Sequence, residues 1–196
     1  PWTVASCRRK AVANTLLERA GLPVPRWTIA QGKIQDHFPL PAIVKPAAED
    51  ASAGLDRQSV VTDRKTLKAR IAAMTEQFDE VLVQQYIAGR EFNVGIVGDR
   101  TLPVSEIDFS TMPAGTWPIL TYAAKWHVGS AEDLGSRPVC PAQISQRFAI
   151  DWNRSTPDGV EWTGKGDRNE QYSVLGQEVI GVAAAEVGHV VDGLPL

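Results

Sequence analysis

The segment PAIVKPAAEDASAGLDRQSVV, residues 41–61, constrains the fold most, because it indicates two apolar strands joined by a loop of small and acidic residues. Lys45 lies inside the first apolar run, where an uncompensated ammonium group costs several kcal/mol of folding free energy. Its head therefore needs a bound anion or a route to water. Ser52 and Gly54 follow in the loop, and such small residues let backbone amides approach phosphate oxygens. The segment predicts a nucleotide-phosphate site, and the alternative is an ordinary β-hairpin with a surface lysine.

Helices and strands alternate in the first part of the chain, and strands dominate beyond residue 87. Apolar spacing predicts helices at 7–20 and 63–78, and apolar or alternating runs predict strands at 27–30, 41–46, 59–62, 80–87, 92–98 and 101–109. We expect strands 80–87 and 92–98 to form a hairpin, with a hinge near Ala88 and Gly89. This order predicts an α+β fold in two lobes.

The composition narrows the classes of function. A formal net charge of -3 over 196 residues provides no basic field for nucleic acid or an anionic membrane. No run of about 18 apolar residues predicts a membrane span. Cys7 and Cys140 are too far apart in sequence to suggest a disulfide framework or a metal cluster. We therefore expect a cytoplasmic protein with small-molecule partners, and neither nucleic acid nor membrane as a partner.

A second segment, EVLVQQYIAGREFNVGIVGD at 80–99, brings an apolar strand to a turn and then to Glu91. Backbone groups from Gln85 to Ile87 can face the edge of an adenine ring, and the Glu91 carboxylate can accept hydrogen bonds from ribose hydroxyls. The alternative is a hairpin with an exposed glutamate.

Six segments occur in an order that resembles the ATP-grasp ligases, specifically the D-alanine:D-alanine ligases and their near relatives. They are ASCRRKAVANTLLERAGLPVP, AIVKPAAEDASAGLDRQSVV, VLVQQYIAGREFNVGIVGD, LPVSEIDF, TYAAKW and VCPA, which cover about residues 4–142. The resemblance implies an ATP-grasp fold with nucleotide held between two lobes. It places a central lobe at 1–87, a partial C-terminal lobe at 88–142 and a tail without family resemblance at 143–196. A homodimer is also expected from the resemblance.

The resemblance also assigns roles to individual residues. The implied ATP-binding residues are Lys10, Lys45, Glu49, Ser52, Gly54, Gln84, Gln85, Tyr86, Ile87, Glu91 and Lys125. Lys125, near the γ phosphate, and Ser52, which contacts phosphate and substrate, are the implied catalytic residues. Asp50 stands where many relatives have glycine, which reduces the expected flexibility of the phosphate-covering loop. Gln84 replaces the usual glutamate of the adenine-binding strand, and its amide can still accept a hydrogen bond from the adenine amino group.

The implied reaction uses ATP to activate the carboxylate of one D-amino acid as an acyl phosphate. The amine of a second D-amino acid then attacks with release of phosphate, and the product serves peptidoglycan synthesis. Magnesium and the lysines neutralise the transferring phosphoryl group. Two alternatives remain open, namely a nucleotide-binding fragment without catalysis and another ATP-grasp amino-acid ligase.

The segments that carry the metal ligands in this family are missing. The chain contains no Arg-x-Asp, and its one Glu-x-Asn, Glu91 to Asn93, belongs to the ribose strand. Asp151 and Asn153 have a similar spacing but occur about forty residues too early, so we assign no metal ligand. The loss of periodicity and resemblance near Gln143, and a start just before the first helix, predict a partial gene product with a foreign tail.

Overall fold

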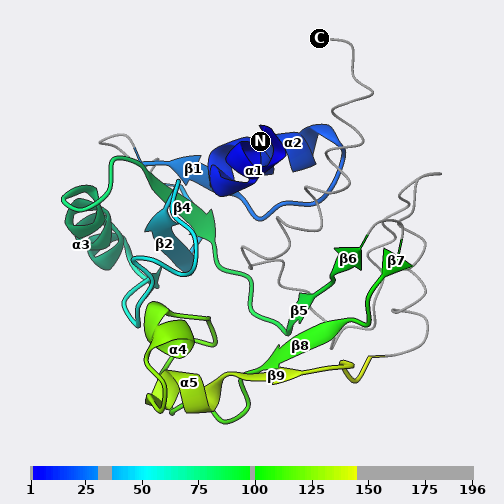
Figure 1. Cartoon of the computed structure of the whole chain (residues 1–196). Helices are drawn as coiled ribbons and strands as arrows, with labels where there is room; N and C mark the ends of the chain where they lie inside the picture. The colour runs from blue at the N-terminus through cyan, green and yellow to red at the C-terminus, as the bar shows by residue number, and fades with distance from the viewer. Residues whose placement is uncertain (1, 31–36, 98–99, 145–196) are drawn as a thin grey trace.

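The structure is a computed structural model that describes residues 2–30, 37–97 and 100–144 (Figure 1). Its helices are α1 (Trp2–Arg8), α2 (Lys10–Arg19), α3 (Arg64–Thr75), α4 (Tyr122–Trp126) and α5 (Ala131–Gly135). Its strands are β1 (Trp27–Ile29), β2 (Ala42–Pro46), β3 (Val60–Val61), β4 (Val81–Gln85), β5 (Glu91–Asn93), β6 (Ile96–Val97), β7 (Arg100–Thr101), β8 (Ser105–Asp108) and β9 (Arg137–Val139). No helix in these ranges is long and apolar enough to cross a membrane.

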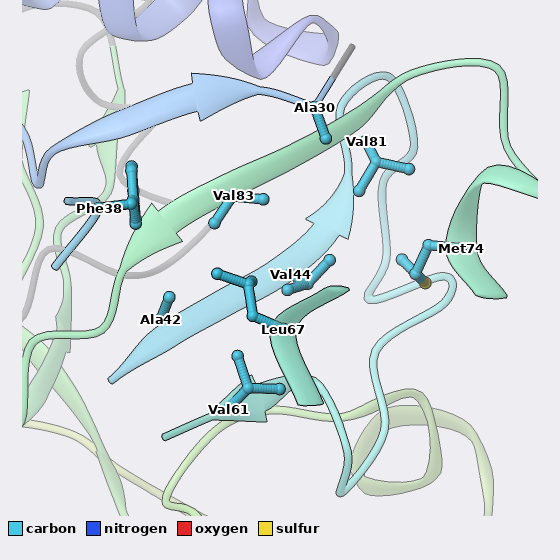
Figure 2. Packing of buried hydrophobic residues seen from close by; sticks show 9 residues of the cluster. All are labelled: Ala30, Phe38, Ala42, Val44, Val61, Leu67, Met74, Val81 and Val83. Carbon is cyan, nitrogen blue, oxygen red and sulfur yellow. The ribbon is translucent and has the colours of Figure 1, made fainter. Parts of the chain in front are cut away.

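The first sheet has the strand order β1-β4-β2-β3, and every neighbouring pair is antiparallel. Because side chains alternate along a strand, the register divides this sheet into two faces. One face packs on α3 through an apolar core (Figure 2). The members of this core are Ala30, Phe38, Ala42, Val44, Val61, Leu67, Met74, Val81 and Val83. The other face carries Lys45 and Gln84, and it is the face that positions the candidate site.

Helix α3 holds its place because its sequence supplies both a cap and an apolar side. The Asp63 carboxylate accepts hydrogen bonds from the backbone N–H groups of Lys65 and Thr66, both at 2.9 Å. Leu67 and Met74 are almost fully buried against the sheet, and Figure 2 shows both side chains pointing toward the strands. The helix therefore closes the apolar face of the first sheet.

The second sheet has the order β5-β8-β9, again antiparallel, and β6 and β7 form a separate pair. Its own apolar cluster contains Phe92, Val94, Val104 and Ala142. Figure 1 shows α4 and α5 beside the connection from β2 to β3, away from α3. The described residues thus form two larger sheets, each with its own core, and the short β6-β7 pair, as the α+β prediction requires.

Two local predictions were wrong. β4 and β5 do not form a hairpin, because β4 is bonded on both edges by β1 and β2, while β5 pairs with β8 in the other sheet. The first helix is two helices, since Arg9 between them has an extended backbone with φ -90° and ψ 95°. Beyond residue 87 the described residues form mainly strands, as expected, together with two short helices, α4 and α5.

Candidate functional site

Lys45 and Gln84 form a buried polar pair on the face of the first sheet opposite α3. Ile43 pairs with Gln84 and Lys45 with Leu82 across β2 and β4, so Lys45 and Gln84 are diagonal neighbours on one face. Lys45 Nζ donates a hydrogen bond to Gln84 Oε1 at 2.7 Å, and the two residues are only 8% and 3% exposed. The structure therefore gives the buried lysine a neutral partner, which cannot offset its charge.

The pKa of Lys45 follows from this environment. Burial and, to a smaller extent, the charge of Lys10 lower this pKa, Glu91 acts in the opposite direction, and the net result is a fall from 10.5 to about 7. Within the described residues, Lys45 forms no salt bridge. An anion close to a buried ammonium group of this kind stabilises its charged form strongly.

Lys10, the first residue of α2, is the second buried lysine. Its Nζ donates to the backbone carbonyl of Glu49, and its backbone N–H donates to Ala47 O at 2.9 Å. Burial lowers the pKa of Lys10 to about 8, although Asp50 and Glu49 oppose the shift. The start of α2 is thus fixed against the loop that follows β2, and it brings a second positive charge close to Lys45.

The loop from 47 to 59 has a demanding backbone conformation. Ala51 and Ser52 both have positive φ values, 56° and 61°, which non-glycine residues adopt at some cost. Gly54 has φ +73°, and a Cβ there would lie 2.9 Å from the Phe78 ring and from Pro46. Arg70 on α3 also donates to Gly54 O at 2.9 Å. Gly54 is therefore needed for the shape of the loop, independently of any contact with a ligand.

Four contacts hold this loop against the region of α4 and α5. Ser52, which is 3% exposed, donates from Oγ to Leu120 O at 2.7 Å. Trp126 Nε1 donates to Ala51 O at 3.0 Å, and the Tyr122 N–H donates to Leu55 O at 2.9 Å. These three contacts surround α4, the helix that carries the half-buried Lys125.

The fourth contact joins the loop to α5. Arg57 Nε donates to the Glu132 carboxylate, and this hydrogen bond lowers the pKa of Glu132. Glu132 is 8% exposed. A buried carboxylate thus meets the outer end of the loop, and sequence reasoning did not identify this pair because its members are 75 positions apart.

The segment predicted to bind adenine lies where β4 ends. The Gln85 N–H donates to Arg26 O at 2.7 Å and the Tyr86 N–H donates to Pro41 O at 2.9 Å. Two of the expected backbone donors are therefore engaged within the protein, so a base would have to use other groups of the segment. Gln85 and Ile87 are half-buried.

An apolar cluster lies beside this segment. It contains Ile43, Val60, Tyr86 and Ile119, with Leu55 and Trp117 packed against it. The Tyr86 and Trp117 rings meet edge to face with centroids 5.0 Å apart. Burial, and then Glu91, raise the pKa of Tyr86 to about 12. The cluster joins the end of β4 to the segment that leads into α4.

The predicted residues thus fall into two groups. Lys45 and Gln84 are hydrogen-bonded on one face of the first sheet, and the charges of Lys10 on α2 and Glu91 on β5 both act on Lys45. Glu49, Ser52 and Gly54 belong to the loop above it, and Ser52 links that loop to the region of Lys125. In the described ranges no group of three His, Cys, Asp or Glu side chains could hold a metal ion. Asp151 and Asn153 lie outside these ranges.

Solved structures with the same arrangement define the class of fold. VanG D-Ala:D-Ser ligase from Enterococcus faecalis matches with a TM-score of 0.60 and 21% identity, over 94% of this chain and 46% of that chain. The ATP complex of D-alanine–D-alanine ligase from Bacillus anthracis matches with a TM-score of 0.54 and 18% identity, over 78% of this chain and 45% of that chain. The fold is the ATP-grasp fold, as the sequence resemblance predicted.

Sequence comparison identifies the family. The family model described as D-ala D-ala ligase C-terminus matches residues 16–150, and this chain belongs to that family. D-alanine–D-alanine ligase from Gluconobacter oxydans strain 621H is 34% identical over 155 residues, which is 74% of this chain and 47% of that protein. The chain spans about half the length of the curated relatives it matches.

Proposed function

We propose that this chain binds ATP between its two lobes and forms the nucleotide-binding part of a ligase that joins D-alanine to D-alanine for peptidoglycan synthesis. The pair of buried lysines, Lys10 and Lys45, carries the proposal. Burial is the chief cause of the lowered pKa of both lysines, because it removes the water that would stabilise their charge. A bound polyanion would stabilise both ammonium groups in place of that water. Membership of the D-alanine ligase family supports the same function, as does the ATP bound to a ligase of this fold.

The proposed roles follow the geometry of the site. Lys10 and Lys45 hold the α and β phosphates, and the loop with Glu49, Ser52 and Gly54 covers them. Glu91 accepts hydrogen bonds from the ribose, and the segment from Gln84 through Gln85 and Tyr86 to Ile87 borders the base. Lys125 and Ser52 act near the γ phosphate, where positive charge and hydrogen-bond donors stabilise phosphoryl transfer.

The chemistry consists of two transfers. The γ phosphoryl group moves from ATP to a carboxylate oxygen of the first D-alanine, which yields ADP and an acyl phosphate. The amine of the second D-alanine attacks the acyl carbon, the new C–N bond forms, the bond to phosphate breaks and the amine loses a proton. Magnesium would enter as a complex with the nucleotide, because it is usually held by substrate phosphates together with only one or two carboxylates.

Nucleotide binding without turnover is the second candidate. It is favoured by the absence of an Arg-x-Asp segment from the whole sequence and of a three-residue metal cluster from the described residues. A ligase for another D-amino acid is a further alternative, since VanG of the same fold is a D-Ala:D-Ser ligase. The lobe boundaries, the homodimer and the cytoplasmic location stay predictions.

Calorimetry with ATP, and ADP release in the presence of magnesium and D-alanine, test the proposal. Lys45→Met should weaken ATP binding about 10- to 100-fold, because it removes a buried charged donor. Lys68→Met, which changes the same charge at an exposed position on α3, should leave binding unchanged. Binding with ADP release supports the ligase, and binding without it supports the second candidate. No binding by the unmodified chain would refute both.

A further inference from the structure

Arg70 joins helix α3 to the loop from 47 to 59 through three contacts at one nitrogen. Its Nη2 donates to Gly54 O at 2.9 Å and to Ser59 Oγ at 3.0 Å. The same nitrogen lies 3.0 Å from a carboxylate oxygen of Asp56. The Arg70 side chain is 11% exposed, and Ser59 is fully buried. The guanidinium group is therefore enclosed between the helix and the loop.

The helix holds this guanidinium group in a fixed place. Arg70 follows Leu67 by three positions and precedes Met74 by four, so the three side chains lie on one side of α3. Leu67 and Met74 are almost fully buried in the core against the first sheet. Apolar packing before and after Arg70 thus fixes the helix, and the arginine presents a fixed donor to the loop.

Stability alone does not account for these contacts. Arg70 Nε is buried and has no hydrogen-bond partner among the described residues, which is unfavourable for folding. The Asp56 side chain is 54% exposed, and ion pairs with an exposed partner contribute little to stability. What the contacts do specify is geometry, because acceptors from three loop residues must meet at one nitrogen.

The part of the loop that Arg70 contacts also positions Ser52. The Leu55 N–H donates to Ser52 O at 2.9 Å, which closes a turn around Gly54. Ser52 has φ 61° and Gly54 has φ 73°, so the turn requires a backbone conformation that the surrounding structure must support. Arg70 supplies that support at Gly54 O on one side, and the hydrogen bond from Ser52 Oγ to Leu120 O supplies it on the other.

We infer that Arg70 is a positioning residue for the nucleotide phosphates, which acts through the turn at Ser52 and Gly54. The inference rests on the proposed function, because that function places the loop over the phosphates and Ser52 near the γ phosphate. A loop that is ordered before ATP arrives does not subtract its ordering free energy from the free energy of binding. Loss of Arg70 should therefore weaken ATP binding, and it should affect AMP little because AMP lacks the γ phosphate.

Calorimetry with ATP and with AMP measures the effect as a ratio of affinities. Arg70→Met should weaken ATP binding about tenfold and AMP binding by less than about twofold. Asp56→Ala removes one of the three acceptors and should weaken ATP binding about threefold, with no further loss when it is combined with Arg70→Met. Because Asp56 is exposed, its variant tests the inference even where Arg70→Met does not fold.

Arg64→Met is the matched control. Arg64 lies on the same helix and also has a buried nitrogen without a hydrogen-bond partner among the described residues, but it donates to Phe38 O, outside the loop. This variant should leave the ratio of affinities for ATP and AMP unchanged, and urea unfolding checks that each variant is folded in the assay.

Three results would overturn the inference while leaving the proposed function in place. They are equal weakening of ATP and AMP binding in Arg70→Met, an unchanged ratio in Asp56→Ala, and a fall of the ratio in Arg64→Met as large as in Arg70→Met. The first would assign Arg70 a merely structural role. No binding of ATP by the unmodified chain would instead refute the proposed function and this inference together.

Discussion

Replacing Lys45 with methionine should stabilise the folded chain, and the gain should shrink as the pH rises. Burial lowers the pKa of Lys45 from 10.5 to about 7, so the unfolded chain binds more protons than the folded chain between these values. Stability therefore rises with pH through this window, and the full cost of the buried lysine is present below pH 7. Methionine has a similar length and no charge, so it removes that cost.

The size of the effect follows from the two pKa values. Linkage gives a cost of about 4 kcal/mol at pH 7 and about 1 kcal/mol at pH 9.5. Loss of the hydrogen bond to Gln84 offsets about 1 kcal/mol of the gain. We therefore expect Lys45→Met to be more stable than the unmodified chain by about 3 kcal/mol at pH 7 and by less than about 1 kcal/mol at pH 9.5.

Urea unfolding followed by circular dichroism at the two pH values measures this difference. Lys68→Met, at an exposed position on α3, controls for the change in net charge and should show no such pH dependence. A Lys45→Met variant that is less stable than the unmodified chain at pH 7 would refute the reasoning. The same gain at both pH values would refute it too, because the stabilisation would then not arise from the buried charge.

Three further predictions concern the same region. ATP binding at pH 8 should take up about one to two protons, because the two buried lysines become fully charged. Calorimetry in buffers of different ionisation enthalpy measures this uptake, and no uptake would contradict a phosphate site there. Gly54→Ala should lower the free energy of unfolding in urea by about 2–4 kcal/mol, because the position combines a positive φ with a steric clash. Gly115→Ala is the control, since Gly115 has φ +80° but no atom within 4 Å of an added Cβ, and it should cost only about 1 kcal/mol. Equal losses of stability in the two variants would exclude the clash. Arg57→Ala should speed hydrogen exchange in the loop, because it breaks the contact with Glu132, whereas Arg19→Ala at an exposed position of α2 should not. Unchanged exchange in Arg57→Ala would show that the contact does not hold the loop.

The sequence predicted well those features that depend on neighbouring residues. Helix α3 was expected at 63–78 and occurs at Arg64–Thr75, because its cap at Asp63 and its buried Leu67 and Met74 lie within one short segment. The strand that carries Lys45 was located for the same reason, since a short apolar run between turn residues indicates a buried strand.

Features that depend on distant residues were not predictable in this way. The apolar run of β4 indicated a strand but not its partners, and β4 pairs with β1 and β2 rather than with β5. The partner of Lys45 requires the register that sets Ile43 opposite Gln84, which no pattern within one strand provides. The same limit applies to Arg57 and Glu132, and to α4, a helix of five residues that is too short for a helical period.

The first sheet separates stability from binding between its two faces. On the face toward α3, apolar side chains such as Val44 and Val83 are fully buried and contribute to folding through burial of apolar area. On the opposite face, Lys45 destabilises the fold at neutral pH, and the adjoining loop adds the positive φ values of Ala51 and Ser52. The fold tolerates these unfavourable free energies because burial of the apolar face against α3 stabilises the same strands. A polyanion that binds the second face relieves the largest of them, since it restores a favourable environment for the buried ammonium group. Binding and folding are therefore coupled through β2, and the coupling should be strongest below about pH 7, where Lys45 is charged and the full cost of its burial is present.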